Sequence, residues 1–107
     1  LPNAGSFFKN PEIPRSEFET LRESHPNLPG YPSTDSNKIK IAAGWLIDSL
    51  GWKGFRENDV GVHKDQALVL VNYGQATGQE IVDLSIKIQS SVQDKFGIQL
   101  EPEVNIM

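Results

Sequence analysis

The stretch 67-ALVLVNYGQATGQEIVDLSIKIQSSVQDKFG-97 carries most of the information about the fold. Its first six residues, 67–72, are apolar on both alternating faces, which predicts a strand covered on both sides. Thr77 and Glu80 have the spacing of a capping box, so a helix begins there. Gly97 suits the left-handed residue that ends a helix. Between these signals, apolar residues recur at three- and four-residue spacing and predict one inward face: Ile81, Leu84, Ile88, Val92 and Phe96.

The preceding segment predicts a second helix and a further strand. The sequence KIKIAAGWLIDSLG, 38–51, reads as a helix that Gly51 ends. Its expected inward residues are Ile41, Trp45 and either Leu46 or Ile47. GWKGF, 51–55, predicts a tight turn bounded by glycines, and VGVH, 60–63, predicts a strand.

The N-terminal third predicts an extended segment, a short helix and a long loop. Residues 5–13 read as a short strand or extended edge ended by prolines, which cannot donate to a ladder. Ser16 and Glu19 have the spacing of a second capping box, so the first helix is expected to start there. Residues 24–37 hold three prolines and one glycine and predict a loop of about 14 residues. Loops of this length are usually disordered or functional.

The order of these elements predicts the fold class. The last segment, IQLEPEVNIM at 98–107, reads as a strand interrupted by Pro102. We therefore expect an α+β fold: a single domain with a small β-sheet and about three helices packed on it. The order alone leaves the strand directions open.

Composition excludes several classes of protein. A chain of 107 residues suits one domain with one core. The net charge is −4 and the ten Lys and Arg residues are scattered, which argues against a nucleic-acid partner. The sequence has no apolar run of membrane-spanning length and no cysteine, so it offers no disulfide or thiolate site. Because residue 1 is Leu rather than Met, we expect the chain to be part of a longer protein.

Polar residues at predicted strand ends and in glycine-bounded turns are the first candidates for chemistry. Each also has an ordinary structural explanation, such as a turn residue, a strand stop or a solvated charge. The two histidines, His25 and His63, lack partners at metal-ligand spacing, so we predict structural roles for both and no metal site. The residues alone support only an α+β domain. The candidates are Ser6, Asn10, Lys53, Gln66, Glu101 and Glu103.

A set of motifs in a fixed order changes this interpretation. NAGSFFKNP, LPGYP, AAGWLID, GWKG, GVHKDQALVLVN and FGIQLEPEV occur in that order along the chain. Together they resemble the C-terminal substrate-binding domain of the UDP-N-acetylenolpyruvoylglucosamine reductases, the flavoenzymes that complete UDP-N-acetylmuramic acid in bacterial peptidoglycan synthesis. The resemblance covers essentially the whole chain, 1–107. It implies a bacterial cytoplasmic enzyme whose FAD-binding domains precede this chain.

The resemblance implies a role for individual residues. Ser6 of GSFFKNP corresponds to the proton donor of the family, and Glu103 of LEPEV to its acidic catalytic residue. The implied partner is UDP-N-acetylglucosamine enolpyruvate. FAD and NADPH are the implied cofactors of the full-length enzyme, and this fragment alone is expected to be inactive and to bind neither. The substrate contacts correspond to Asn10, Tyr31, Lys53 and Gln66.

The long loop gains a purpose from the same comparison. A loop that bears Tyr31 resembles the subgroup of the family that closes a loop over bound substrate. An alternative stays open, in which the chain is a stand-alone module that binds a sugar nucleotide without redox chemistry. A parent gene long enough for flavin domains would favour the enzyme.

Overall fold

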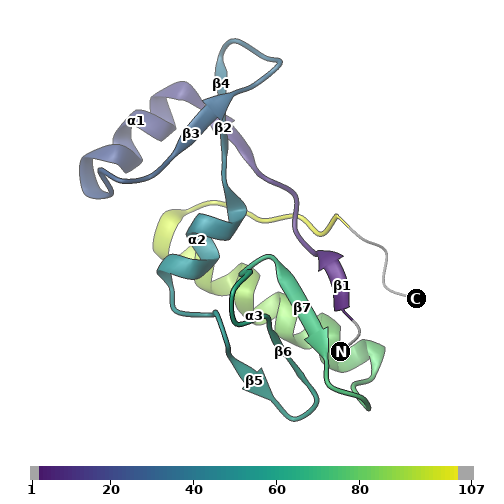
Figure 1. Cartoon of the computed structure of the whole chain (residues 1–107). Helices are drawn as coiled ribbons and strands as arrows, with labels where there is room; N and C mark the ends of the chain where they lie inside the picture. The colour runs from purple at the N-terminus through teal and green to yellow at the C-terminus, as the bar shows by residue number, and fades with distance from the viewer. Residues whose placement is uncertain (1–2, 104–107) are drawn as a thin grey trace.

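The computed structural model describes residues 3–103, and in this range it contains three helices and seven strands (Figure 1). The helices are α1 (Arg15–Ser24), α2 (Ala43–Ser49) and α3 (Gly78–Phe96). The strands are β1 (Asn3–Ser6), β2 (Glu12–Pro14), β3 (Gly30–Pro32), β4 (Lys38–Ile41), β5 (Arg56–Glu57), β6 (Val60–Val62) and β7 (Val69–Asn72). The fold is α+β, as predicted, but the strands form two sheets instead of one.

The larger sheet has the order β1-β7-β6-β5, with every neighbouring pair antiparallel. β7 begins at Val69, two residues later than predicted, and its residues Val69, Leu70 and Val71 are all buried, which confirms a strand covered on both sides. In Figure 1, α3 runs along this sheet. The residues that α3 turns inward are Leu84, Ser85, Ile88, Val92 and Phe96.

The ends of α3 also match the prediction. The Glu80 backbone N–H donates to Thr77 Oγ1 at 3.1 Å, and the Thr77 N–H donates to Glu80 Oε1 at 3.3 Å. The capping box is therefore formed in both directions. Gly97 follows the helix with φ of 69°, the left-handed conformation expected of a helix stop.

The smaller sheet has the order β2-β4-β3 and lies with α1 at the opposite end of the molecule from β5 and β6 (Figure 1). Gly30 is required by close packing there, because a Cβ at this position would lie 2.5 Å from a ring carbon of Phe18 and 2.7 Å from Ile39. The buried residues of this sheet, Ile13, Ile39 and Ile41, belong to the same hydrophobic core as α3.

Two extended segments join the two ends of the molecule. Residues 7–11 run antiparallel to residues 101–103, through a bridge between Phe8 and Pro102. Phe7 and Phe8 are both buried, with ring centroids 5.1 Å apart in an edge-on arrangement. The two adjacent phenylalanines therefore form part of the core at the junction of the two sheets.

Two predicted elements in the first half are wrong. Residues 38–41 form β4 instead of the start of a helix, and α2 begins only at Ala43. Residues 5–13 form parts of two strands rather than one, because β1 ends at Ser6 and β2 begins at Glu12.

The helix start, the loop and the C-terminal strand also need correction. The first helix begins at Arg15 with Pro14 at its N-cap and no side-chain cap, so Ser16 does not form the predicted capping box. The segment 24–37 is not all loop, because it contains the last residue of α1 and all of β3. Residues 98–103 contribute an isolated bridge rather than a strand, and residues 104–107 lie outside the described range. None of the helices within residues 3–103 is both long and apolar enough to cross a membrane.

Candidate functional site

Lys53 lines the first cavity, which we call the Lys53 pocket. It has a volume of about 450 Å³ and lies between α2 and the segment that leads into β7. The Lys53 Nζ lies 3.3 Å from Asp48 Oδ2 on α2. Both side chains are more than a third exposed, so this ion pair contributes at most about 1 kcal/mol to stability. The lining residues are Gly44, Trp45, Asp48, Lys53, Asp65, Gln66, Ala67, Leu68 and Val69.

The turn that carries Lys53 has a fixed backbone. Gly51 and Gly54, on either side of it, have φ of 83° and 80°, a conformation that favours glycine. The Gly54 N–H donates to the carbonyl of Val62 at 3.2 Å, and the Phe55 N–H donates to the carbonyl of Trp52 at 2.9 Å. The predicted tight turn is confirmed, and it is tied to β6.

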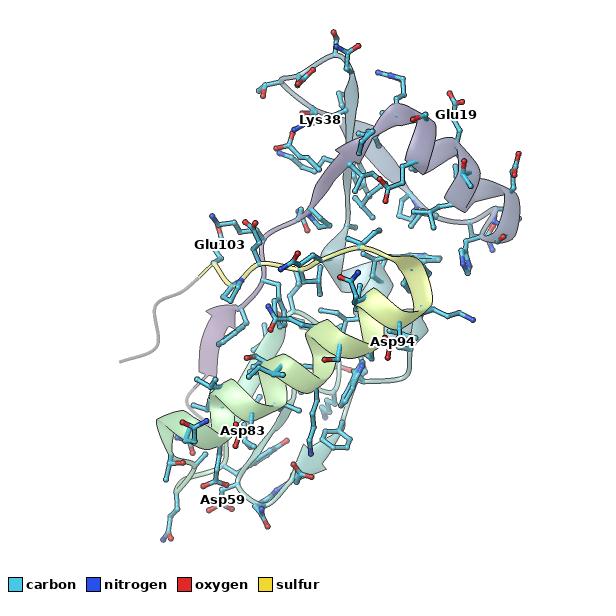
Figure 2. The ribbon with its side chains drawn as sticks, turned by 180° about the vertical axis from the view of Figure 1, so that it is seen from behind. Glu19, Lys38, Asp59, Asp83, Asp94 and Glu103 are labelled. Atoms are coloured by element: carbon cyan, nitrogen blue, oxygen red, sulfur yellow. The ribbon has the colours of Figure 1, made fainter. Side chains whose placement is uncertain are left out.

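The second cavity, the Glu103 pocket, has a volume of about 300 Å³. It joins residues from near both ends of the described chain, because the Glu103 N–H donates to the carbonyl of Phe7 at 2.7 Å. Figure 2 shows Glu103 where the C-terminal segment passes the N-terminal one. Two of its lining residues are lysines, three carry a carboxylate or an amide, and two are apolar. The lining residues are Phe8, Lys9, Asn10, Glu12, Lys40, Leu68 and Glu103.

Asn10 has a structural contact as well as a place in this pocket. Its Oδ1 accepts a hydrogen bond from the Ala43 N–H at 3.0 Å, so the side chain satisfies a backbone donor at the buried N-terminus of α2. Because the amide oxygen is used in this way, a ligand in the Glu103 pocket would meet the NH₂ group of Asn10.

Leu68 lines both pockets and therefore marks the place where they meet. β1 runs beside this point: the Phe7 N–H donates to the carbonyl of Leu68 at 2.8 Å, and Ser6 is the register partner of Val69. The backbone of Ser6 thus lies next to a wall of the Lys53 pocket. Asn10, Lys53, Gln66 and Glu103 line one or other of the two pockets.

Tyr31 lies outside both cavities. It is 50% exposed and sits on β3 opposite Lys40, which is in turn opposite Glu12 on β2. Directly paired residues share one face of an antiparallel sheet, so Tyr31, Lys40 and Glu12 form a row that leads to the Glu103 pocket. Ser33, two residues after Tyr31, donates from its hydroxyl to the Glu12 carboxylate.

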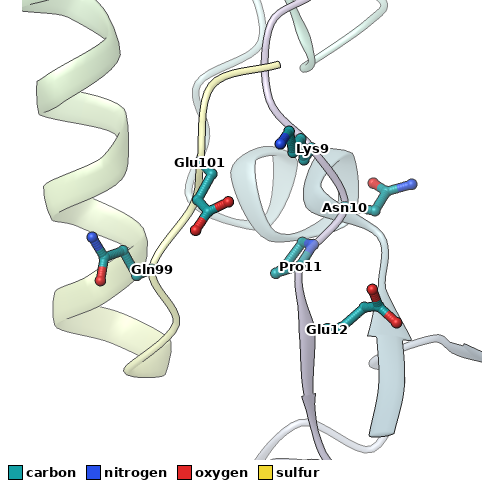
Figure 3. A pocket seen from close by; sticks show the side chains of 6 residues that line it. All are labelled: Lys9, Asn10, Pro11, Glu12, Gln99 and Glu101. Carbon is teal, nitrogen blue, oxygen red and sulfur yellow. The ribbon is translucent and has the colours of Figure 1, made fainter. Parts of the chain in front are cut away.

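A third cavity, the Glu101 pocket, has a volume of about 340 Å³ and lies along the same two segments (Figure 3). Figure 3 shows Gln99 and Glu101 on the C-terminal segment, facing the chain that carries Lys9, Asn10, Pro11 and Glu12. Glu101 and Glu103 therefore line different cavities, although they are only two residues apart.

Each histidine contacts another residue of the chain. The His25 ring packs edge-on against Phe96 with centroids 4.9 Å apart, and His63 Nδ1 accepts from the Asp65 N–H at 3.0 Å. These contacts agree with the structural roles predicted for them. Within residues 3–103, no three His, Cys, Asp or Glu residues come together in a way that could hold a metal ion.

Sequence reasoning missed most of the other lining residues of the pockets, and three of them show why. Lys40 and Asp48 line them as charged groups, and Leu68 joins them. The alternation of KIKI at 38–41 could have revealed Lys40, since a period of two indicates a strand that presents Lys40 on one face. Neither Asp48 nor Leu68 has a local signal, because their roles depend on which segments pack together.

Comparison with known proteins gives one consistent result. The family described as UDP-N-acetylenolpyruvoylglucosamine reductase, C-terminal domain, matches residues 1–107. The UDP-N-acetylenolpyruvoylglucosamine reductase of Chromobacterium violaceum is 56% identical over 107 residues, which is 100% of this chain and 31% of that protein. The proteins of the same name from Pseudomonas savastanoi pv. phaseolicola and Pseudomonas aeruginosa are 54% and 56% identical over 106 residues, 99% of this chain and 31% of each relative.

The chain thus spans about 31% of the length of these curated relatives. The family match extends over the two sheets, the three helices and both pockets around Leu68. The chain belongs to the UDP-N-acetylenolpyruvoylglucosamine reductase C-terminal domain family.

Proposed function

We propose that this chain is the substrate-binding part of a longer reductase that converts UDP-N-acetylglucosamine enolpyruvate to UDP-N-acetylmuramate. One observation supports the proposal most directly. Four of the residues that the family resemblance assigns to substrate or catalysis line two cavities that meet at Leu68. A fifth, Ser6, pairs through its backbone with Val69 in the wall of one of them.

The flavin and NADPH of the proposed enzyme belong to the part of the protein outside this chain. The described residues do not fit a dinucleotide: the N-terminus of α3 is capped by its own Thr77 and Glu80, and the glycines around Lys53 shape a turn instead of a phosphate loop. In the full-length enzyme, FAD reduced by NADPH would supply a hydride to the methylene carbon of the enolpyruvyl group.

The residues of this chain have complementary tasks in the proposed reaction. Ser6 donates a proton from its hydroxyl to the neighbouring carbon, where negative charge develops. Glu103 acts as a carboxylic acid, whose O–H donates a hydrogen bond to the adjacent carboxylate of the substrate and stabilises the charge that spreads into it. Lys53 exchanges its contact with Asp48 for the diphosphate of the substrate, which it meets as a point charge.

The remaining residues orient the substrate. Asn10 offers its NH₂ group, since its oxygen is bonded to the N-terminus of α2. Gln66 contributes an amide in the Lys53 pocket. Tyr31 closes over the bound nucleotide with its ring and hydroxyl, from its place next to Lys40 in the row that leads to the Glu103 pocket. This closing movement is the behaviour of the subgroup with the tyrosine loop.

Replacing Lys53 with Met in the full-length enzyme tests the proposal. Hydrogen bonds to charged groups are worth about 1.5–3 kcal/mol, so the KM for the UDP-sugar should rise about 10- to 100-fold. The assay is substrate-dependent NADPH oxidation. Lys64→Met is the matched control, because Lys64 is exposed and lines neither pocket. Equal KM values in the two variants would contradict the assignment of the Lys53 pocket to the diphosphate. Tight UDP-sugar binding by the native protein without any turnover would favour the stand-alone binding module.

Closure of the Tyr31 segment can be tested by amide hydrogen exchange in the full-length enzyme. Gly30–Pro32 already pairs with β4, so its amides are protected without ligand. Bound ligand should therefore slow amide exchange mostly in the turn at 33–37 and at the ends of β3. We expect slower exchange across 24–37 when the UDP-sugar is bound. Peptides that cover residues 84–96 of α3 serve as the internal control, and their amide exchange should not change. Equal exchange of residues 24–37 with and without ligand would rule out closure.

A further inference from the structure

The turn that carries Lys53 is fastened to α3 by a single side-chain pair. The indole Nε1 of Trp52 donates to Ser91 Oγ at 2.9 Å, across 39 residues of sequence. The same hydroxyl donates to the carbonyl of Ile88 at 2.8 Å, so Ser91 is held by its own helix while it accepts from the indole. Both groups are partly buried, where competition from water is reduced.

Further contacts fix the Trp52 ring next to Lys53. Trp52 packs edge-on against Phe55, with ring centroids 4.9 Å apart and an angle of 77° between the planes. Gly51 and Gly54 stand on either side of Trp52 and Lys53, and both have the positive φ that favours glycine. The indole therefore adds a side-chain anchor beside Lys53 to the backbone hydrogen bonds that tie this turn to β6.

A second contact on the same edge of α3 is weaker. Lys87, one helical turn before Ser91, forms an ion pair with Glu57 at 2.7 Å. Both of these side chains are about half exposed, so the pair adds little to the position of the segment. The Trp52–Ser91 hydrogen bond is thus the less exposed of the two contacts between α3 and the 51–57 region.

We propose that Ser91 is a positioning residue for substrate binding, acting through the indole of Trp52 to keep the ammonium group of Lys53 in the Lys53 pocket. The inference rests on the proposed function, in which Lys53 binds the diphosphate of the substrate. A fixed turn keeps Lys53 close to its bound position before substrate arrives, so less conformational entropy is lost on binding. Without the indole contact, the turn samples other positions and affinity falls.

Ser85 provides a matched control on the same helix. Ser85 is buried, and its Oγ donates to the carbonyl of Val82 at 2.7 Å, the same contact to the third preceding residue that the partly buried Ser91 makes. Ser85 has no indole partner among the described hydrogen bonds. Ser85→Ala therefore reproduces the loss of a helix hydroxyl without touching the Lys53 turn.

The experiment uses the full-length reductase with UDP-N-acetylglucosamine enolpyruvate as the probe. Ser91→Ala should raise KM about 3- to 10-fold and leave kcat within about twofold, because one hydrogen bond that serves binding is lost. Ser91→Thr keeps the hydroxyl and should restore KM, and Ser85→Ala should leave it unchanged. Trp52→Phe removes the indole N–H together with part of the ring, and it gives a second test if Ser91→Ala folds poorly.

Combination with Lys53→Met separates positioning from general stability. If Ser91 acts through Lys53, adding Ser91→Ala to Lys53→Met should raise KM no further. An equal additional rise in both backgrounds would overturn the inference, as would an unchanged KM in Ser91→Ala and Trp52→Phe while Lys53→Met raises it. If Lys53→Met itself has no effect on KM, the diphosphate assignment of the proposed function fails, and this inference fails with it.

Discussion

Replacing Ser6 with Ala in the full-length enzyme is expected to slow reoxidation of the reduced flavin by substrate about 10²- to 10⁴-fold. This is the range that a well-positioned general acid contributes. In the proposed reaction, the Ser6 hydroxyl supplies the proton that completes the saturated product. Alanine has no exchangeable proton, and it adds no bulk to β1, whose backbone pairing with Val69 should persist.

The effect should be confined to one half of the catalytic cycle. Reduction of the flavin by NADPH precedes any charge on the enolpyruvyl group, so its rate should be unchanged. Stopped-flow absorbance of the flavin measures the two half-reactions separately. Ser49→Ala is the control, because Ser49 lies at the exposed end of α2 and bonds only its own helix, through Leu46. Equal slowing of both half-reactions, or of neither, would show that Ser6 is not the proton donor.

Features determined by neighbouring residues were predicted well from the sequence. The capping box of Thr77 and Glu80 and the stop at Gly97 each depend on a few adjacent residues, and α3 has the predicted bounds within one residue. Its inward face follows from spacing alone, because a long helix on a sheet buries one stripe. The buried strand β7 was equally clear from its apolar run.

Segments whose structure depends on distant partners were predicted less well. KIKI at 38–41 was joined to the following helix, yet its alternation is that of a strand, and it pairs with β2 and β3 on either side. The predicted helix start at Ser16 is wrong for a related reason. β2 runs through Pro14, so the chain enters the helix at Arg15, one residue before the expected cap.

The site itself combines both kinds of information. Family motifs named its residues, but no spacing in the sequence brings Asn10 beside Glu103. Their place in one pocket depends on the antiparallel passage of 7–9 and 101–103. The joining wall at Leu68 and the ion pair of Lys53 with Asp48 likewise arise only from packing. The Trp52–Ser91 pair belongs to the same class.

Replacing Glu103 with Gln is expected to have the second largest effect, slowing flavin reoxidation by substrate about 10²- to 10³-fold. A donor aimed at charge that develops in the transition state typically contributes this much. Glutamine keeps the shape of the side chain and offers an NH₂ group as donor, but it cannot supply the O–H hydrogen bond of a carboxylic acid.

The structure indicates that this substitution should preserve the fold. Glu103 is attached to the N-terminal segment by its backbone N–H, which donates to Phe7, while its exposed side chain lines the Glu103 pocket. Glu101 is attached in the same way, through a carbonyl that accepts from the Lys9 N–H at 2.8 Å, but its side chain lines the Glu101 pocket instead. Glu101→Gln is thus a close control, because it makes the same substitution on the same segment.

The comparison of the two variants decides between chemistry and general electrostatics. If Glu103 stabilises charge on the substrate carboxylate, only Glu103→Gln should slow reoxidation, and flavin reduction by NADPH should proceed at the native rate in both variants. Loss of a negative charge near the pocket would instead affect the two variants alike, because Glu101 and Glu103 lie only two residues apart. Stopped-flow traces that slow equally in both, or in neither, would exclude Glu103 from the catalytic machinery. A residue with only a packing role would tolerate glutamine with almost unchanged turnover, since the two side chains have nearly the same volume.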